Sequence, residues 1–344
     1  TNPIRKRKDR GANIELGFYG FTEADMDKTF NAGNLIGLGT TTLKNIIAHL
    51  EKCYTGPLGI EFKYISNQTK IDWLTNAVEK TMLQPVAIAQ KKRILQKLNE
   101  GVMFEKFLHT KYIGQKRFSL EGGETTIAAL DAIISMAANG GVEEVVIGMA
   151  HRGRLNVLAN IMGKTYEQIF SEFEGNEFDE NSFDGDVKYH LGFSTDVETQ
   201  HGKKVHLLLT PNPSHLEAVD PIVQGIVRAK LDEHKNSTFD DIAPILIHGD
   251  AAVAAQGIVY EVIQMSLLKG YSTGGTIHLV INNQVGFTTD YIDARSSTYC
   301  TDVGKVTLSP VFHVNGDDVE ALVYTIRLAM EYRQRLVRRL WCRP

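Results

Sequence analysis

The sequence predicts an α/β protein in which a mostly parallel, doubly wound sheet follows a helical N-terminal region. Before about residue 115, apolar residues recur at helical spacing. Beyond it, short runs rich in Val, Ile and Leu alternate with helical stretches, which is typical of a parallel sheet with helices on both faces. Four of these runs end in clusters of polar residues. We therefore divide the chain into a helical region, 1–115, and an α/β domain, 116–344.

The helical region contains three candidate helices, in the stretches GTTTLKNIIAHLEK, TKIDWLTNAVEK and KKRILQKLNEGVMFEKFL. In the first stretch, threonines precede Leu43 and predict a capped helix start. Gly37 and Gly39 lie just before it, but no strand pattern precedes them and no third glycine follows. They therefore indicate a turn that starts a helix rather than a dinucleotide-binding fingerprint.

The α/β domain contains four candidate strands, each followed by polar residues. VEEVVIGMA precedes HRGR (151–154), KVHLLLT precedes PNPSH (211–215), APILI precedes HGD (248–250), and TIHLVI precedes NNQ (282–284). In open α/β sheets, ligands bind outside the carboxyl ends of the strands. The four polar clusters therefore predict one binding site along that edge of the sheet.

Two features close the chain. The stretch DDVEALVYTIRLAMEYRQ predicts a last helix, which we expect Asp317 of the Gly316-Asp317 pair to cap. The helix pattern then stops, and we expect residues 336–344 to form an atypical, arginine-rich tail.

Composition excludes several classes of protein. The 344 residues are 43% hydrophobic and 23% charged, which is ordinary for a globular protein. A formal charge of -4 argues against a general nucleic-acid binder, and we expect the basic start at 5–8 to be a solvated tail. No apolar run reaches the roughly 20 residues that a membrane-spanning helix needs. The 3 cysteines lie far apart, which fits a reducing compartment better than a disulfide framework.

The polar clusters after the third and fourth strands suggest a metal site. Asparagine is depleted in strands, so Asn282 and Asn283 directly after a strand need an explanation. One helix and one strand separate Asp250 from Asn283, so both side chains should emerge at neighbouring strand ends. Carboxylate and amide oxygens suit Mg²⁺, whose coordination is usually completed by phosphates. The small Ala251 and Ala252 would let a phosphate approach the amides of the helix start.

Asp250 and Asn283 together resemble the thiamin diphosphate motif, which runs from Gly-Asp-Gly to Asn-Asn; Ala251 replaces the last glycine here. Five longer blocks narrow the resemblance: GMAHRGRLNVLANIMGK, DVKYHLGFSTD, NPSHLEAVDPIV, HGDAAVAAQGIVYE and INNQVGFTT. In this order they resemble the 2-oxoglutarate dehydrogenase family, the thiamin diphosphate-dependent first components of a multienzyme complex. The resemblance extends from about Gly33 to Gln334 and implies the diphosphate-binding domain of the thiamin diphosphate-binding fold.

The resemblance also implies roles for individual residues. The Mg²⁺ ligands would be Asp250, Asn283 and the carbonyl oxygen of Val285. The cofactor would contact Arg152, Ser214, Leu216, Asp250, Ala251, Ala252, Asn283 and Val285. The 2-oxo acid would contact His151, His190 and Ser194, with His151 and His190 as the catalytic residues. A dianionic substrate needs hydrogen-bond donors and protonatable groups, which the two histidines provide.

Each of these motifs also has a purely structural explanation. Asp250 could cap a helix, HRGR could be a solvated basic turn, and NPSH could be a turn with a serine cap. His190 could be a structural hydrogen-bonding residue. The order of the long blocks favours the functional interpretation for all of them.

By resemblance, the protein would decarboxylate 2-oxoglutarate oxidatively in the citric acid cycle and pass the succinyl group to the lipoyl group of the dihydrolipoyl succinyltransferase component. Full-length members would be homodimers, located in the bacterial cytoplasm or the mitochondrial matrix. We expect this chain to be partial, without the pyrimidine-binding and C-terminal domains, and therefore inactive alone. The alternatives are a catalytically incomplete thiamin diphosphate- and Mg²⁺-binding module, or another 2-oxo acid dehydrogenase.

Overall fold

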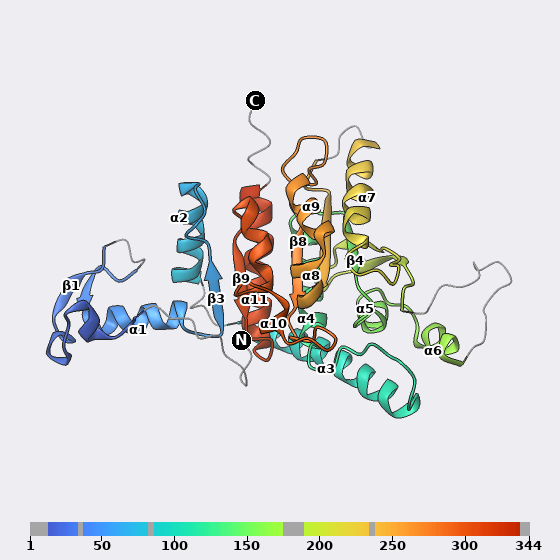
Figure 1. Cartoon of the computed structure of the whole chain (residues 1–344), viewed down its shortest axis with the longest axis horizontal. Helices are drawn as coiled ribbons and strands as arrows, with labels where there is room; N and C mark the ends of the chain where they lie inside the picture. The colour runs from blue at the N-terminus through green and yellow to red at the C-terminus, as the bar shows by residue number, and fades with distance from the viewer. Residues whose placement is uncertain (1–12, 34–36, 82–85, 175–188, 234–237, 338–344) are drawn as a thin grey trace. The chain divides into compact units, whose positions relative to one another are not determined.

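The computed structural model describes residues 13–33, 37–81, 86–174, 189–233 and 238–337 (Figure 1). The chain divides into two compact units. One unit consists of the described residues up to 86 together with 308–315, and the other consists of 87–307 and the described residues from 316 onward. None of the described helices is long and apolar enough to cross a membrane.

The first unit mixes helices with short strands. Its elements are η1 (Leu16–Tyr19), η2 (Glu23–Asp25), β1 (Thr29–Asn31), β2 (Thr40–Thr42), α1 (Leu43–Tyr54), β3 (Leu58–Glu61), α2 (Gln68–Asn76), the π-helix η3 (Ala77–Thr81) and β9 (Val311–Val314). The capped start at Leu43 is confirmed, because Oγ1 of Thr42 accepts a hydrogen bond from the amide of Asn45 at 3.3 Å. The antiparallel pairs β1–β2 and β3–β9 were not predicted, since none of their members exceeds four residues.

The second unit carries the large sheet and its helices. Its helices are α3 (Ile88–Lys111), α4 (Thr125–Asn139), α5 (Arg154–Asn160), α6 (Tyr166–Glu174), α7 (Val219–Glu233), α8 (Asp250–Ala255), α9 (Gly257–Met265), α10 (Tyr291–Ala294), η4 (Cys300–Thr307), α11 (Val319–Tyr332) and η5 (Arg333–Val337). Its strands are β4 (Glu144–Met149), β5 (Phe193–Glu198), β6 (Lys204–Leu209), β7 (Ile242–Gly249) and β8 (Ile277–Ile281). Helix α3 ends shortly before residue 115. The domain boundary at residue 115 stays a prediction.

The sheet is mostly parallel, as the sequence predicts. Its strand order is β5-β6-β4-β7-β8, and the four predicted strands β4, β6, β7 and β8 all run in the same direction. The edge strand β5 was not predicted and is antiparallel, with Phe193 opposite Leu209. Because of this direction, the first residues of β5 lie beside the carboxyl end of β6. The segment that leads into β5 therefore reaches the same edge of the sheet as the predicted polar clusters.

The order of the strands has a switch point between β4 and β7 at this edge. The chain goes from β4 to β6 on one side and then to β7 on the other side of β4. Loops that leave β4 and β7 therefore diverge, and ligands of open α/β sheets bind at such a switch point. The residues that follow β4 and β7 are those of the HRGR and HGD clusters.

The core of the sheet depends on the apolar stripe of α7. Val219, Val223 and Val227 recur along α7 and pack with Val146 of β4 and Leu246 of β7. Such spacing places all three valines on one side of the helix. Figure 1 shows α7 running along the sheet. This contact fixes α7, and with it the loop between β6 and α7 that carries the NPSH cluster.

Gly148 lies at this contact and supports a prediction. A Cβ atom there would lie 2.7 Å from Cγ2 of Val223 and 2.8 Å from Cδ2 of Leu246. Gly148→Ala should therefore overpack the core and lower the free energy of unfolding by about 1–3 kcal/mol, as measured by urea denaturation. Gly225→Ala, on the exposed side of α7 with nothing within 4 Å, is the control and should raise it by about 0.5–1 kcal/mol. Equal effects of the two changes would contradict the packing described.

Two details of the predicted helices are wrong. The stretch after Asp250 is two helices, α8 and α9, because Gln256 between them is extended, with φ -81° and ψ 116°. The weak helix former Gly257 follows it directly. The cap of α11 is Asp318, whose Oδ1 accepts from the amide of Ala321 at 2.9 Å, rather than Asp317. Most of the predicted tail, 338–344, lies outside the described residues.

Candidate functional site

The four predicted polar clusters follow four neighbouring strands that run in one direction. In the register of β7 and β8, Gly249 lies opposite Ile281, so Asp250 and Asn282 leave adjacent strands at the same level. The other two clusters follow β4 and β6, which continue the same edge. The parallel sheet therefore brings the four clusters to one edge of the sheet. We call this edge, with residues 151–154, 211–215, 248–250 and 282–284, the rim.

Asp250 is a deeply buried carboxylate of the rim. It is only 2% exposed, and among the described residues its Oδ1 has no hydrogen-bond partner. Asp250 is the first residue of α8, and no side chain caps that helix, so the explanation of Asp250 as a helix cap is not realised. Burial raises the pKa of Asp250, although the nearby cation Arg295 opposes the shift. A buried carboxylate with an oxygen left over is suited to a cation.

Arg295 is a neighbour of Asp250 that sequence reasoning missed. Its Nη1 lies 3.6 Å from Oδ2 of Asp250, and its guanidinium lies 5.3 Å from the ring centroid of Tyr291. It follows α10, a helix of four residues without a periodic pattern. Only the fold brings this cation to the rim.

The loop after β8 lies beside the start of α8. A Cβ atom on Gly286 would lie 3.4 Å from Cβ of Ala251, so this loop passes close to the Asp250 helix. Oδ1 of the exposed Asn283 accepts a hydrogen bond from the amide of Val285 at 3.0 Å. The next residue, Gln284, has φ 57°, in the left-handed region, and the side chain of Val285 is 58% exposed. The Asn283 amide oxygen is thus used within its own loop, which is tightly turned.

These residues fit a hard divalent cation. The unpartnered oxygen of Asp250 and the amide and carbonyl oxygens of the adjacent loop are the ligand types that Mg²⁺ prefers. Ala251 and Ala252 leave the start of α8 free of large side chains. Helix α8 has only six residues, so a phosphate there would depend on backbone amides more than on a helix dipole.

His151 and His190 lie on the part of the rim away from β8, beside the central strand β4 and the edge strand β5. His151 follows β4 and is half-buried, with its ring centroid 3.9 Å from that of Phe118. Burial lowers the pKa of His151, and the nearby Arg152 and His190 lower it further. The backbone carbonyl of His190 accepts from the amide of Asn212 at 3.0 Å, which ties His190 to the end of β6. The two histidines are close enough to influence each other.

Ser194 belongs to a hydrogen-bonded chain of three side chains on β5 and β6, Ser194–His206–Asp196. Its Oγ lies 3.0 Å from Nε2 of His206, and Nδ1 of His206 lies 2.7 Å from Oδ1 of Asp196. With Nδ1 donating to Asp196, Nε2 of His206 accepts from the Ser194 hydroxyl. This chain of hydrogen bonds sets the direction of the Ser194 hydroxyl. His206 and Asp196 were not predicted from the sequence.

The predicted cofactor contacts after β4 and β6 are exposed. Arg152 donates from Nη1 to the carbonyl of Ser119 at 3.0 Å. Ser214 is exposed and Leu216 is 37% exposed, both in the loop between β6 and α7. In the same loop, Asn212 is 4% exposed, and both ends of its side-chain amide lack a partner among the described residues. Buried polar groups without partners are rare, so Asn212 is a binding candidate that its position in an ordinary turn motif concealed.

Arg154 links three backbone segments that meet at the rim. It is fully buried, and its guanidinium donates to the carbonyls of Met149 at 2.5 Å, Leu191 at 2.7 Å and Thr210 at 3.0 Å. These acceptors lie at the end of β4, before β5 and after β6. One side chain therefore joins three of the segments that meet at the rim.

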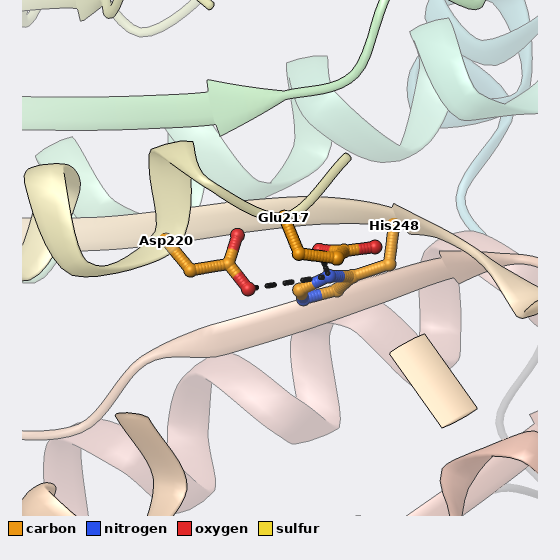
Figure 2. A group of neighbouring side chains, drawn as sticks. All are labelled: Glu217, Asp220 and His248. Carbon is orange, nitrogen blue, oxygen red and sulfur yellow. Dashed lines mark hydrogen bonds and ion pairs between the residues drawn. The ribbon is translucent and has the colours of Figure 1, made fainter. Parts of the chain in front are cut away.

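A second buried polar group lies behind the rim, between the loop after β6 and strand β7. Nδ1 of His248 lies 2.6 Å from Oε2 of Glu217 and 3.9 Å from Oδ2 of Asp220 (Figure 2). Its Nε2 lies 2.9 Å from Nδ1 of His278. Glu217 has φ 67°, a left-handed conformation that costs a residue other than glycine about 1–3 kcal/mol.

The pKa shifts in this group indicate its charges. Burial lowers the pKa of His248, but Glu217 and Asp220 more than offset this, so the pKa is raised. Burial raises the pKa of Asp220 to about 8 and lowers that of His278 to about 3, with the charge of His248 contributing to the latter. The raised pKa of His248 favours its protonated form, in which Nδ1 faces Glu217 and Nε2 faces Nδ1 of His278.

Comparison with known proteins gives consistent results. Residues 96–338 match the family model described as dehydrogenase E1 component. The chain is 50% identical to a 2-oxoglutarate dehydrogenase E1 component of Cupriavidus necator, over 95% of this chain and 35% of that protein. It is 47% identical to a mitochondrial 2-oxoglutarate dehydrogenase of Dictyostelium discoideum, over 96% of this chain and 34% of that protein. A multifunctional 2-oxoglutarate metabolism enzyme of Mycolicibacterium vanbaalenii is 47% identical, over 97% of this chain and 27% of that protein.

The chain thus spans about a third or less of the length of these curated relatives. The family match covers most of this chain and includes the whole rim from β4 to the loop after β8. Similarity on that scale, together with the parallel sheet, makes this chain a member of the dehydrogenase E1 component family.

Proposed function

We propose that this chain is the diphosphate-binding part of a 2-oxoglutarate dehydrogenase first component and that it holds thiamin diphosphate through Mg²⁺. The observation that carries the proposal is Asp250, a buried carboxylate with an unpartnered oxygen beside the Asn283 loop. The names and high identities of the curated relatives point to the same reaction. The wider proposal includes a doubly wound sheet and a separate helical N-terminal region.

The chain's own residues would bind and orient the cofactor. Asp250, Asn283 and the carbonyl of Val285 would hold the metal ion. The remaining proposed contacts to the cofactor are Arg152, Ser214, Leu216, Ala251 and Ala252. When bound, thiamin diphosphate supplies a nucleophilic carbon and an electron sink for decarboxylation.

The substrate would lie against His151, His190 and Ser194. His151 is neutral in the free protein because its pKa is lowered, so it presents both a donor and an acceptor to an incoming 2-oxo acid. His206 orients the Ser194 hydroxyl. Two histidines suit a substrate with two carboxylates, which favours 2-oxoglutarate over pyruvate or branched-chain 2-oxo acids.

The rest of the proposal follows the family. The acceptor would be the lipoyl group of the dihydrolipoyl succinyltransferase component, in the citric acid cycle, and the full-length protein would be a homodimer. We propose a bacterial cytoplasmic or mitochondrial matrix location. A thiamin diphosphate- and Mg²⁺-binding module without turnover is the second candidate, supported by the same unpartnered oxygen of Asp250.

Calorimetric titration of the chain with thiamin diphosphate tests the proposal. Binding should be measurable with Mg²⁺ and lost when EDTA removes the metal ion, because the diphosphate completes the coordination of the ion. Thiamin without phosphates, titrated under the same conditions, should bind at least tenfold more weakly. Equal binding of the two compounds, or binding that ignores EDTA, would contradict a diphosphate site built on Asp250.

His190 should distinguish dicarboxylic from monocarboxylic substrates. In a protein of the length of its relatives, His190→Ala should raise KM for 2-oxoglutarate about 10- to 150-fold, because a charge-assisted hydrogen bond contributes about 1.5–3 kcal/mol. KM for 2-oxobutyrate, which lacks the second carboxylate, should change much less. His201→Ala, an exposed histidine in the turn after β5, is the control and should change neither KM. Equal effects of His190→Ala on both substrates would return His190 to a structural role.

A further inference from the structure

Glu217 and His248 form a buried pair just behind the rim, and the exposed His278 contacts His248 from the next strand. Glu217 lies in the loop between β6 and α7, His248 lies on β7, and His278 lies on the adjacent strand β8. His248 is 1% exposed and Glu217 is 5% exposed, so water competes little for their hydrogen bond. Figure 2 shows the carboxylate of Glu217 directed at the ring of His248.

The two ends of this pair adjoin the proposed cofactor contacts. Glu217 directly follows Leu216, and His248 lies two residues before Asp250. Glu217 adopts its left-handed conformation although it has a side chain, so something outside its own backbone holds it there. Its 2.6 Å contact with His248 is such a constraint. The pair therefore ties the Leu216 loop to the strand that carries Asp250.

The distances favour a shared proton rather than a second metal ion. Glu217, Asp220 and His248 carry suitable ligand atoms within 4.8 Å of one another. Two ligand atoms at about 2.1 Å from one tetrahedral ion lie about 3.4 Å apart. The observed 2.6 Å between Nδ1 and Oε2 is a hydrogen-bond length, and the 3.9 Å to Asp220 is too long for one. The bond between Glu217 and His248 is therefore a fixed structural contact.

We infer that Glu217 and His248 are positioning residues, which hold the Leu216 loop at a fixed distance from Asp250 so that both meet the diphosphate and its metal ion together. This inference rests on the proposed function. Partners of this kind, one step removed from a metal site, typically affect metal affinity 10- to 100-fold when changed. The contact of 2.9 Å between Nε2 of His248 and Nδ1 of His278 also fixes the orientation of the His248 ring.

Calorimetric titration of the 344-residue chain with Mg²⁺ and thiamin diphosphate tests the inference. Glu217→Ala should weaken binding about tenfold or more. Glu217→Gln should stay within about threefold of the wild type, because its amide oxygen can still accept a hydrogen bond from Nδ1 of His248. Rescue by Gln distinguishes positioning from a need for the Glu217 charge. Loss of binding in both variants to the same extent would overturn the inference.

A matched control separates positioning from general destabilisation. Glu105 is 3% exposed, belongs to the same unit and accepts from Asn156 and from the amide of Leu120, both at 3.0 Å. Glu105→Ala should lower Tm as Glu217→Ala does but leave the cofactor affinity unchanged. A Glu217→Ala protein that has a lowered Tm and binds with wild-type affinity would show that the pair is only structural.

Two further measurements complete the test. If Glu217→Ala does not fold, Glu217→Asp takes its place; its shorter side chain should weaken binding about tenfold, and wild-type affinity would overturn the inference. Failure of the proposed function has a different signature, because the wild-type chain would then not bind, or Asp250→Asn would bind equally well. The inference alone fails when the wild type binds, Asp250→Asn does not, and Glu217→Ala binds normally.

Discussion

Replacing Asp250 by asparagine should weaken Mg²⁺-dependent binding of thiamin diphosphate at least a hundredfold. The change keeps the shape of the side chain and removes its charge. At a separation of about 4 Å and an effective dielectric constant of about 20, two unit charges interact by about 4 kcal/mol, and a divalent ion at bonding distance interacts more strongly. Because Asp250 is buried, water does not replace this interaction. The loss should therefore exceed that of any variant at an exposed contact such as Ser214.

The measurement is a titration of each protein with cofactor at several Mg²⁺ concentrations. Asp317→Asn is the matched control, since Asp317 also follows a glycine but lies outside the rim. It should bind as the wild type does. Wild-type affinity for Asp250→Asn, with the control also unchanged, would place the metal ion elsewhere.

Replacing Arg154 by leucine should lower the free energy of unfolding by about 4 kcal/mol or more. The variant leaves the carbonyls of Met149, Leu191 and Thr210 without the donor that now serves them. Each orphaned buried group costs about 1–3 kcal/mol, and the smaller side chain leaves part of the space empty. Removing a buried charge recovers some desolvation energy, so the estimate is below the sum of the separate losses.

Urea denaturation monitored by circular dichroism measures this effect. Arg154→Lys should fall between the wild type and Arg154→Leu, because an ammonium keeps the charge but cannot reach three carbonyls as a planar guanidinium does. Arg152→Leu, two residues away and exposed, should change stability by less than about 1 kcal/mol. A stable Arg154→Leu protein would show that the three segments hold together without this clamp.

The central strands β4 and β7 were predictable because each is buried on both faces. VVIGM in β4 and PILI in β7 are continuous apolar runs, and such runs identify strands of a parallel sheet whatever the local turns are. The predicted residues Asp250 and Asn283 lie at adjacent strand ends for the same reason. When two strands are parallel and adjacent, the residues that follow them lie at the same edge of the sheet.

Elements with one exposed face or with few residues were not predictable in this way. In β5, Ser194, Asp196 and Glu198 are exposed and alternate with partly buried residues, so the segment looks like an ordinary polar loop. The strands β3 and β9 each have four residues and pair across most of the chain. Their existence depends on a partner that no local pattern reveals.

The supporting residues of the site escaped prediction for a different reason. Arg154 and His248 lie inside the motifs HRGR and HGD, where their polar character suggests exposure, yet both are fully buried. Arg295 reaches Asp250 from a separate short helix. What determines these three positions is the need to satisfy buried carbonyls and carboxylates, and that need becomes visible only when the segments are brought together.

The two sides of the proposed metal site lie on strands that should differ in how often they open, because β7 is inside the sheet and β8 is at its edge. Strand β7 has neighbours on both sides, whereas β8 is an edge strand of the described sheet, followed by a turned and exposed loop. Interior strands open rarely and edge segments open often. In the proposed metal site, Asp250 would therefore be the fixed ligand, and Asn283 would belong to the segment that opens more often. The proposed site then predicts that changes in the Asn283 loop alter the dissociation rate of the cofactor more than its association rate.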